Sequence, residues 1–137
     1  NIPVKIGCSG KYQYPDPQAC FGPREVLYGE TLRLVQGCSL AIGHLSLALD
    51  QAIVSRKPVV LVDDAAFTPW RRMGFRDVIR RFRQEPLLNA EIGGKQIEQA
   101  MSRDLTFYQD VEEQYFRESG VVGDYRQICA AAFRLLA

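Results

Sequence analysis

The sequence predicts an α/β protein: a Rossmann-like, three-layer domain with a short parallel sheet and a helical C-terminal tail, over residues 1–137 as a single domain. Short apolar runs alternate with helix-like stretches, a pattern typical of βαβ units and therefore of parallel strands. One of these runs, Val59-Val60-Leu61-Val62, is apolar without alternation, which indicates a strand buried on both faces. Right-handed crossovers then place helices on both faces of the sheet.

The elements follow from periodicity, turn residues and helix stop signals. The predicted strands cover residues 4–8, 39–42, 59–62 and 87–89. The predicted helices cover residues 31–36, 45 or 46–55, about 74–84, 95–102, 106–119 and 125–136. Residues 11–29 are predicted to be a long loop because Pro15, Pro17 and Pro23 interrupt them.

Length and charge limit the classes of function. With 137 residues, the chain is long enough for one core, and a net charge of +1 gives no general attraction to nucleic acid or membranes. No apolar run approaches the roughly 20 residues that span a bilayer, and no signal peptide is recognisable, so we expect a cytoplasmic protein. A strand so near residue 1, without an initiator Met, leads us to expect a fragment of a longer two-domain protein. Four Cys and one His lack zinc spacing, so no metal or cofactor is expected.

The turn between the strand at 39–42 and the next helix carries the candidate site. It consists of Gly43, His44, Leu45, Ser46 and Leu47, at the carboxyl end of a predicted parallel strand, where ligands bind in open sheets. The glycine permits close backbone approach, the serine suits an N-cap, and first-turn N–H groups attract anions. The histidine next to them can donate a hydrogen bond or act as a general acid or base. The same pattern is also typical of a turn with no ligand, so both interpretations stay open.

The segment from Gly43 through Ser46 and Ala48 to Lys57-Pro58-Val59-Val60-Leu61 resembles the nucleotide-sugar half of GT-B-type glycosyltransferases and of surface (capsular) polysaccharide biosynthesis proteins. Residues 28–35 are similar to the helix that those proteins carry before this strand. The first strand and the Leu87-Leu88-Asn89 strand are also similar to theirs. In the family, His-Pro stands where this chain has Ser9-Gly10.

The resemblance implies a C-terminal, GT-B-like domain that binds a nucleoside diphosphate sugar, with the missing N-terminal domain supplying the acceptor side. The full protein would transfer a sugar to a glycan or a lipid-linked acceptor. His44 would be the catalytic residue, and the diphosphate would lie on the helix N-terminus at residues 45–47. The family commonly holds the ribose with an acidic residue where this chain has Gln51, and Asp50 stands just before it.

Alternatives of other classes remain. The chain fits a non-catalytic interaction or scaffold domain if the turn is purely architectural, and half of a sugar-nucleotide epimerase shares the same features. The isolated chain is expected to bind a nucleotide weakly and to catalyse nothing.

Charged residues suggest further contacts. Lys11 follows the first strand at the same sheet edge, where it can neutralise a diphosphate. Asp63 and Asp64 end the strand at 59–62 and can orient a sugar hydroxyl or hold a metal, but Asp after a strand more often makes a turn. One helical face bears four arginines opposite an apolar stripe, and it suits a solvated face, a partner or an anionic membrane surface. These arginines are Arg72, Arg76, Arg80 and Arg83, and the stripe is Phe75, Val78, Ile79 and Phe82.

Overall fold

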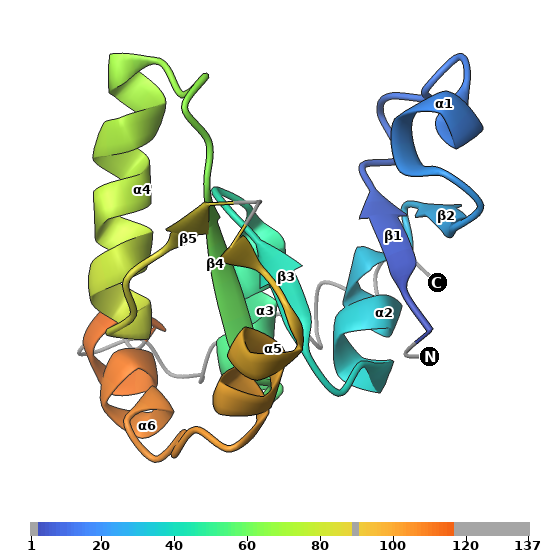
Figure 1. Cartoon of the computed structure of the whole chain (residues 1–137). Coiled ribbons are helices and arrows are strands. Elements are labelled where there is room, and N and C mark those ends of the chain that lie inside the picture. Colours follow the sequence, from blue (N-terminus) through green and yellow to red (C-terminus); the bar gives the residue numbers. More distant parts are fainter. Residues whose placement is uncertain (1–2, 89–90, 117–137) are drawn as a thin grey trace, which may run out of the picture.

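Strands and helices alternate along the chain in the computed structural model, which describes residues 3–88 and 91–116 (Figure 1). The strands are β1 (Lys5–Cys8), β2 (Glu25–Tyr28), β3 (Ala41–Gly43), β4 (Val59–Asp63) and β5 (Leu87–Leu88). The helices are α1 (Pro17–Phe21), α2 (Thr31–Gly37), α3 (Leu47–Val54), α4 (Pro69–Phe82), α5 (Gly94–Met101) and α6 (Tyr108–Val111), and a π-helical turn (Glu112–Phe116) follows. The helix predicted at 125–136, the end of that predicted at 106–119 and Asn89 lie outside the described residues.

All described strand pairs are parallel, as predicted, but they form two sheets. One contains β3, β4 and β5 in that order, and the other contains β1 and β2. Helix α2 joins them, since it contacts both β1 and α3. The α/β class with short parallel sheets is therefore confirmed, and its arrangement is compatible with a Rossmann-like fold.

The loop predicted over residues 11–29 is wrong, because α1 and β2 lie in it. Asp16 caps α1, its Oδ1 accepting a hydrogen bond from the Ala19 N–H at 2.9 Å, and Pro17 occupies the first turn. Proline fits there because the first helical N–H groups have no intrahelical partner and its φ is already helical. Pro17, one of the prolines on which the loop prediction rests, thus belongs to the first turn of a helix.

Helix α4 begins at Pro69 rather than near residue 74. The reason is again a cap followed by proline: Thr68 Oγ1 accepts a hydrogen bond from the Arg71 N–H at 3.4 Å, and Pro69 occupies the first turn. The helix ends at Phe82, and its C-cap is Arg83, whose φ of 46° is in the left-handed region.

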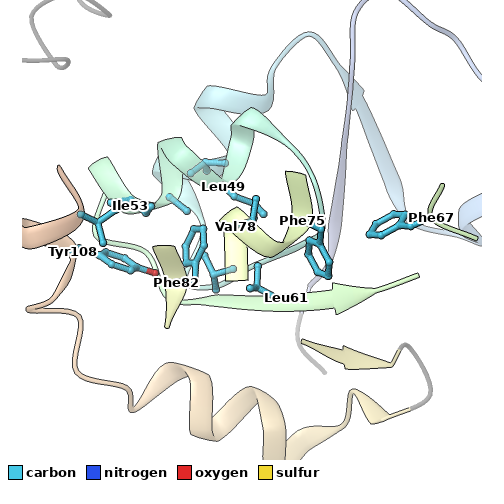
Figure 2. Close-up of a cluster of buried hydrophobic side chains, with 12 residues drawn as sticks. Leu49, Ile53, Leu61, Phe67, Phe75, Val78, Phe82 and Tyr108 are labelled. Carbon is cyan, nitrogen blue, oxygen red and sulfur yellow. The ribbon is translucent and has the colours of Figure 1, made fainter. Parts of the chain in front are cut away.

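The core lies between α3, α4 and β4. Figure 2 shows side chains of α3 and α4 packed against Leu61, with Phe67 at one end of the cluster and Tyr108 at the other. The predicted apolar stripe of α4 is confirmed, since three of its four residues are buried and Ile79 packs against the cluster. The cluster comprises Val35, Leu49, Ala52, Ile53, Val59, Leu61, Phe67, Phe75, Val78, Phe82, Tyr108 and Val111.

Both faces of β4 are covered. Val59, Val60 and Leu61 are all buried, as predicted for a strand with helices on both sides. The strand order β3-β4-β5 takes both crossovers in one direction, so α3 and α4 share a face, contrary to the prediction that the crossovers place helices on both. Helix α5 contacts β4, and it lies in front of the sheet in Figure 1 while α3 lies behind.

Helix α6 is attached to the turn that leads into β4. The hydroxyl of buried Tyr108 donates a hydrogen bond to the Lys57 carbonyl at 3.1 Å, and Arg56 Nη2 lies 2.9 Å from Glu112 Oε2. No helix among residues 3–88 and 91–116 is long and apolar enough to cross a bilayer.

Candidate functional site

The turn after β3 is an exposed corner of the molecule at the carboxyl end of a parallel strand. The strand ends at Gly43, and α3 starts at Leu47. Ser46 is the N-cap, as predicted: its Oγ accepts a hydrogen bond from the Ala48 N–H at 3.2 Å, and its own backbone is extended. Leu47 is 81% exposed, so the start of α3 faces solvent.

His44 is held in place by two contacts. Its Nδ1 accepts a hydrogen bond from the Leu45 N–H at 2.7 Å, and its ring meets Phe67 edge-on, with 5.3 Å between the ring centroids. An accepting Nδ1 puts the proton of the neutral ring on Nε2. The exposed imidazole therefore has Nε2–H left to donate to a ligand.

The backbone N–H groups near the turn are only in part available. Those of Leu45, Ala48 and Leu49 already donate, to His44 Nδ1, to Ser46 Oγ and to the Ser46 carbonyl. Within the described part of the chain, the N–H groups of Ser46 and Leu47 have no hydrogen-bond partner. An anion at this corner would therefore meet these two amides and His44 Nε2–H.

Gly43 has an architectural reason to be glycine. A Cβ at this position would lie 3.2 Å from Cδ2 of Leu49, whose side chain is buried in the core. The missing side chain thus lets α3 pack closely on β3. The space on that side of Gly43 is occupied by the Leu49 side chain.

Asp50, predicted to contact the substrate, is buried and pairs with Arg81 of α4. Nε of the same guanidinium lies 3.2 Å from Asp77 Oδ2. Burial raises the pKa of the Asp50 carboxyl, and the charge and hydrogen bond of Arg81 oppose this rise. The carboxylate is therefore engaged between two helices, and Gln51 beside it is half-buried.

The acids at the end of β4 hold the start of α4. Asp63 Oδ1 lies 3.3 Å from Arg72 Nη1, and Nη2 of the same guanidinium donates to the Asp64 carbonyl at 3.2 Å. Asp64 Oδ1 accepts a hydrogen bond from the Ala66 N–H at 2.9 Å, which is the turn that Asp after a strand commonly makes. Of the described residues, no group of three or more His, Cys, Asp or Glu is placed to hold a metal ion.

Lys11 lies apart from these residues in the fold. It follows β1, in the two-stranded sheet, and its N–H donates to Ser9 Oγ at 3.2 Å. Its exposed side chain forms no ion pair or hydrogen bond with the turn after β3 in the part of the chain that is described. The structure thus brings together His44, Ser46 and Leu47, while Lys11 and Asp50 belong to other surroundings.

The four arginines predicted on one face of α4 divide into two pairs. Arg72 binds Asp63, and Arg83 Nη2 lies 3.0 Å from Asp110 Oδ2, with its guanidinium over the Phe107 ring. Arg76 and Arg80 are exposed, without an ion pair to any described residue.

Two residues of the region escaped sequence reasoning. Phe67 orients His44, and Arg81 occupies Asp50. The spacing of Asp77 and Arg81, four residues apart on a helix, does predict an ion pair between those two. Nothing in the sequence marks the contact with Asp50, because it depends on how α3 packs against α4.

Comparisons of the chain with protein-family models, with curated proteins and with solved structures gave no match.

Proposed function

We propose that this chain is the nucleotide-sugar-binding half of a glycosyltransferase of surface polysaccharide biosynthesis, with a GT-B-like fold. The observation that carries the proposal is the exposed turn at the carboxyl end of β3, where His44 lies directly beside the Ser46-capped start of α3. A parallel sheet with helices on both faces supports it, since such sheets bind ligands beyond their carboxyl ends. The resemblance in sequence supplies the substrate class, a nucleoside diphosphate sugar.

Each group at the turn has a defined task in this proposal. The N–H groups of Ser46 and Leu47 donate hydrogen bonds to the diphosphate, aided by the dipole of α3. His44 Nε2–H donates to the phosphate oxygen that gains charge as the sugar leaves, which is electrostatic stabilisation of the transition state. Gln51 contacts the ribose. The acceptor and its base come from another domain, so the chain alone binds a nucleotide weakly and transfers nothing.

The test is a titration of the ¹⁵N-labelled chain with UDP, CDP and GDP, followed by amide shifts. The proposal expects the largest shifts at Ser46 and Leu47 with one of the nucleotides. Replacing His44 by Ala should weaken binding about tenfold, the usual worth of a hydrogen bond to a charged group. Ser39→Ala, at an exposed serine before β3, is the control and should bind like the native chain. Shifts confined to other residues, or none with any nucleotide, would overturn the proposal.

A non-catalytic interaction domain is the second candidate. It is favoured by two contacts that fill the expected ligand side of the turn, namely Leu49 against Gly43 and Arg81 on Asp50. For such a domain, none of the three nucleotides shifts the amide signals of residues 43–47. His44→Ala remains folded, and its titrations with the nucleotides look the same as those of the native chain.

A further inference from the structure

Four large apolar side chains are exposed where α3 and α4 begin. They form the α3–α4 apolar patch: Leu45 (36% exposed), Leu47 (81%), Trp70 (77%) and Met73 (59%). Trp70 and Met73 lie on the first turns of α4, at the upper end of this helix in Figure 1. Leu45 lies against the same helix, because a Cβ on Gly74 would be 3.3 Å from its Cδ1. Scattered exposed apolar residues are ordinary, but several that gather where two packed helices begin mark an interaction surface.

Unpaired positive charge borders this patch. Residues 70, 73, 76 and 80 are spaced by three, three and four, so Trp70, Met73, Arg76 and Arg80 share the outward face of α4. Arg71, Arg76 and Arg80 are exposed and have no ion pair with any residue in 3–88 or 91–116. Helix α4 contains five arginines and a single acid, Asp77, which forms an ion pair with Arg81. The surface is therefore apolar at the helix start and cationic along the adjoining turns.

We infer that this surface docks the protein on an anionic lipid bilayer. The exposed Trp, Met and Leu side chains would enter the boundary between headgroups and acyl chains, and the arginines would contact lipid phosphates. A second copy of the same face fits less well, because a two-fold contact would bring arginines against arginines. This inference is independent of nucleotide binding, since it uses the outward face of α4 and the flank of the turn after β3.

The chain contains one tryptophan, so fluorescence reports on the patch directly. The full chain is mixed with vesicles of phosphatidylcholine alone and with vesicles of phosphatidylcholine and phosphatidylglycerol in equal amounts. The expected result is a blue shift of Trp70 emission with the anionic vesicles only, reversed by added salt. No blue shift with anionic vesicles would overturn the inference. So would an equal shift with both compositions, because the arginines would then contribute nothing.

Charge-matched variants separate the patch from the general charge of the protein. Arg76→Gln with Arg80→Gln should weaken binding to anionic vesicles, measured by cosedimentation, by roughly 25-fold, since each arginine near the surface contributes about fivefold. The control, Arg33→Gln with Lys95→Gln, removes the same charge from exposed positions on α2 and α5 and should bind like the native chain. Equal losses in the two variants would contradict docking through α4. A blue shift that grows with protein concentration in the absence of lipid would show a self-contact instead and would also overturn it.

Discussion

Asp50 of α3 and Arg81 of α4 form an ion pair inside the protein, with only 12% and 14% of their side-chain surfaces exposed. Removing both charges from water costs more than their attraction returns unless the geometry is very favourable. The raised pKa of Asp50 agrees with this, because burial is its largest cause and Arg81 offsets only part of it. We therefore expect the pair to fix how α3 lies against α4 while adding little net stability.

Removing only the cation should be the damaging change. Arg81→Met leaves the Asp50 carboxylate buried without its partner, and we expect the free energy of unfolding at pH 7 to fall by about 3 kcal/mol. Adding Asp50→Asn to this variant should restore most of the loss, because the buried charge is then gone. Urea denaturation of the full chain measures both, and Arg76→Met, at an exposed arginine of the same helix, is the matched control. If Arg81→Met is as stable as Arg76→Met, the expectation is contradicted.

The burial of Asp50 also predicts a direction of pH dependence. The native pKa of Asp50 lies above its ordinary value of 3.8, so the native state holds this proton more tightly than the unfolded chain. The stability that this proton contributes is fully present below pH 3.8 and is lost as the pH rises through the native pKa. Asp50→Asn cannot titrate. The unfolding free energy of the native chain, minus that of Asp50→Asn, should therefore decrease as the pH is raised from below 3.8 toward 7. A difference that increases with pH would mean that Arg81 outweighs burial.

Two glycines that face leucines should respond differently to alanine. Gly43→Ala places a Cβ 3.2 Å from Leu49, which is buried in the core and has little room to move, so we expect a loss of about 1 kcal/mol or more. Gly74→Ala places a Cβ 3.3 Å from Leu45, which is at the surface and can turn away. Alanine is favoured over glycine in a helix by up to about 1 kcal/mol, so this variant should be neutral or more stable. Thermal or urea unfolding compares them, and equal losses would show that Leu45 is as fixed as Leu49.

The local features of the fold could be predicted from sequence because their causes lie within a few residues. The Ser46 cap depends on an N–H two residues ahead, and the burial of β4 follows from its unbroken apolar run. The strand β2 was missed because its four residues lie among prolines and glycines, and its pairing with β1 is about 20 residues distant in sequence. Proline is a common loop residue, but a proline that directly follows a capping residue, as in Asp16-Pro17, is equally typical of the start of a helix.

The candidate site was predictable to a lesser extent. Sequence alone placed His44 and Ser46 together, since they are neighbours in one turn. It could not show that Leu49 covers Gly43 or that Arg81 occupies Asp50, because both contacts depend on how helices pack. It also grouped four arginines of α4 by helical spacing, and only the positions of Asp63 and Asp110 divide them into paired and exposed ones.

The attachment of α6 offers a prediction for the other end of the core. Tyr108 is 1% exposed, its ring packs edge-on against Phe82, and its hydroxyl donates to the Lys57 carbonyl at 3.1 Å. Tyr108→Phe keeps the ring but leaves this carbonyl without its donor, so the free energy of unfolding should fall by about 1 kcal/mol. Tyr12→Phe, at a residue that is 59% exposed, is the control and should change nothing measurable.

The same hydroxyl should respond to alkaline pH. Burial raises the pKa of Tyr108 above its ordinary value of 10.0, so the unfolded chain loses this proton first as the pH rises. The native chain should therefore lose stability above pH 10.0 faster than Tyr108→Phe does. The difference between their free energies of unfolding should shrink as the pH rises. Urea denaturation at pH 7 and in alkaline buffer measures both effects. If Tyr108→Phe matches the native chain at every pH, the hydrogen bond to Lys57 does not hold α6 in place, and the apolar contacts of the ring alone account for its docking.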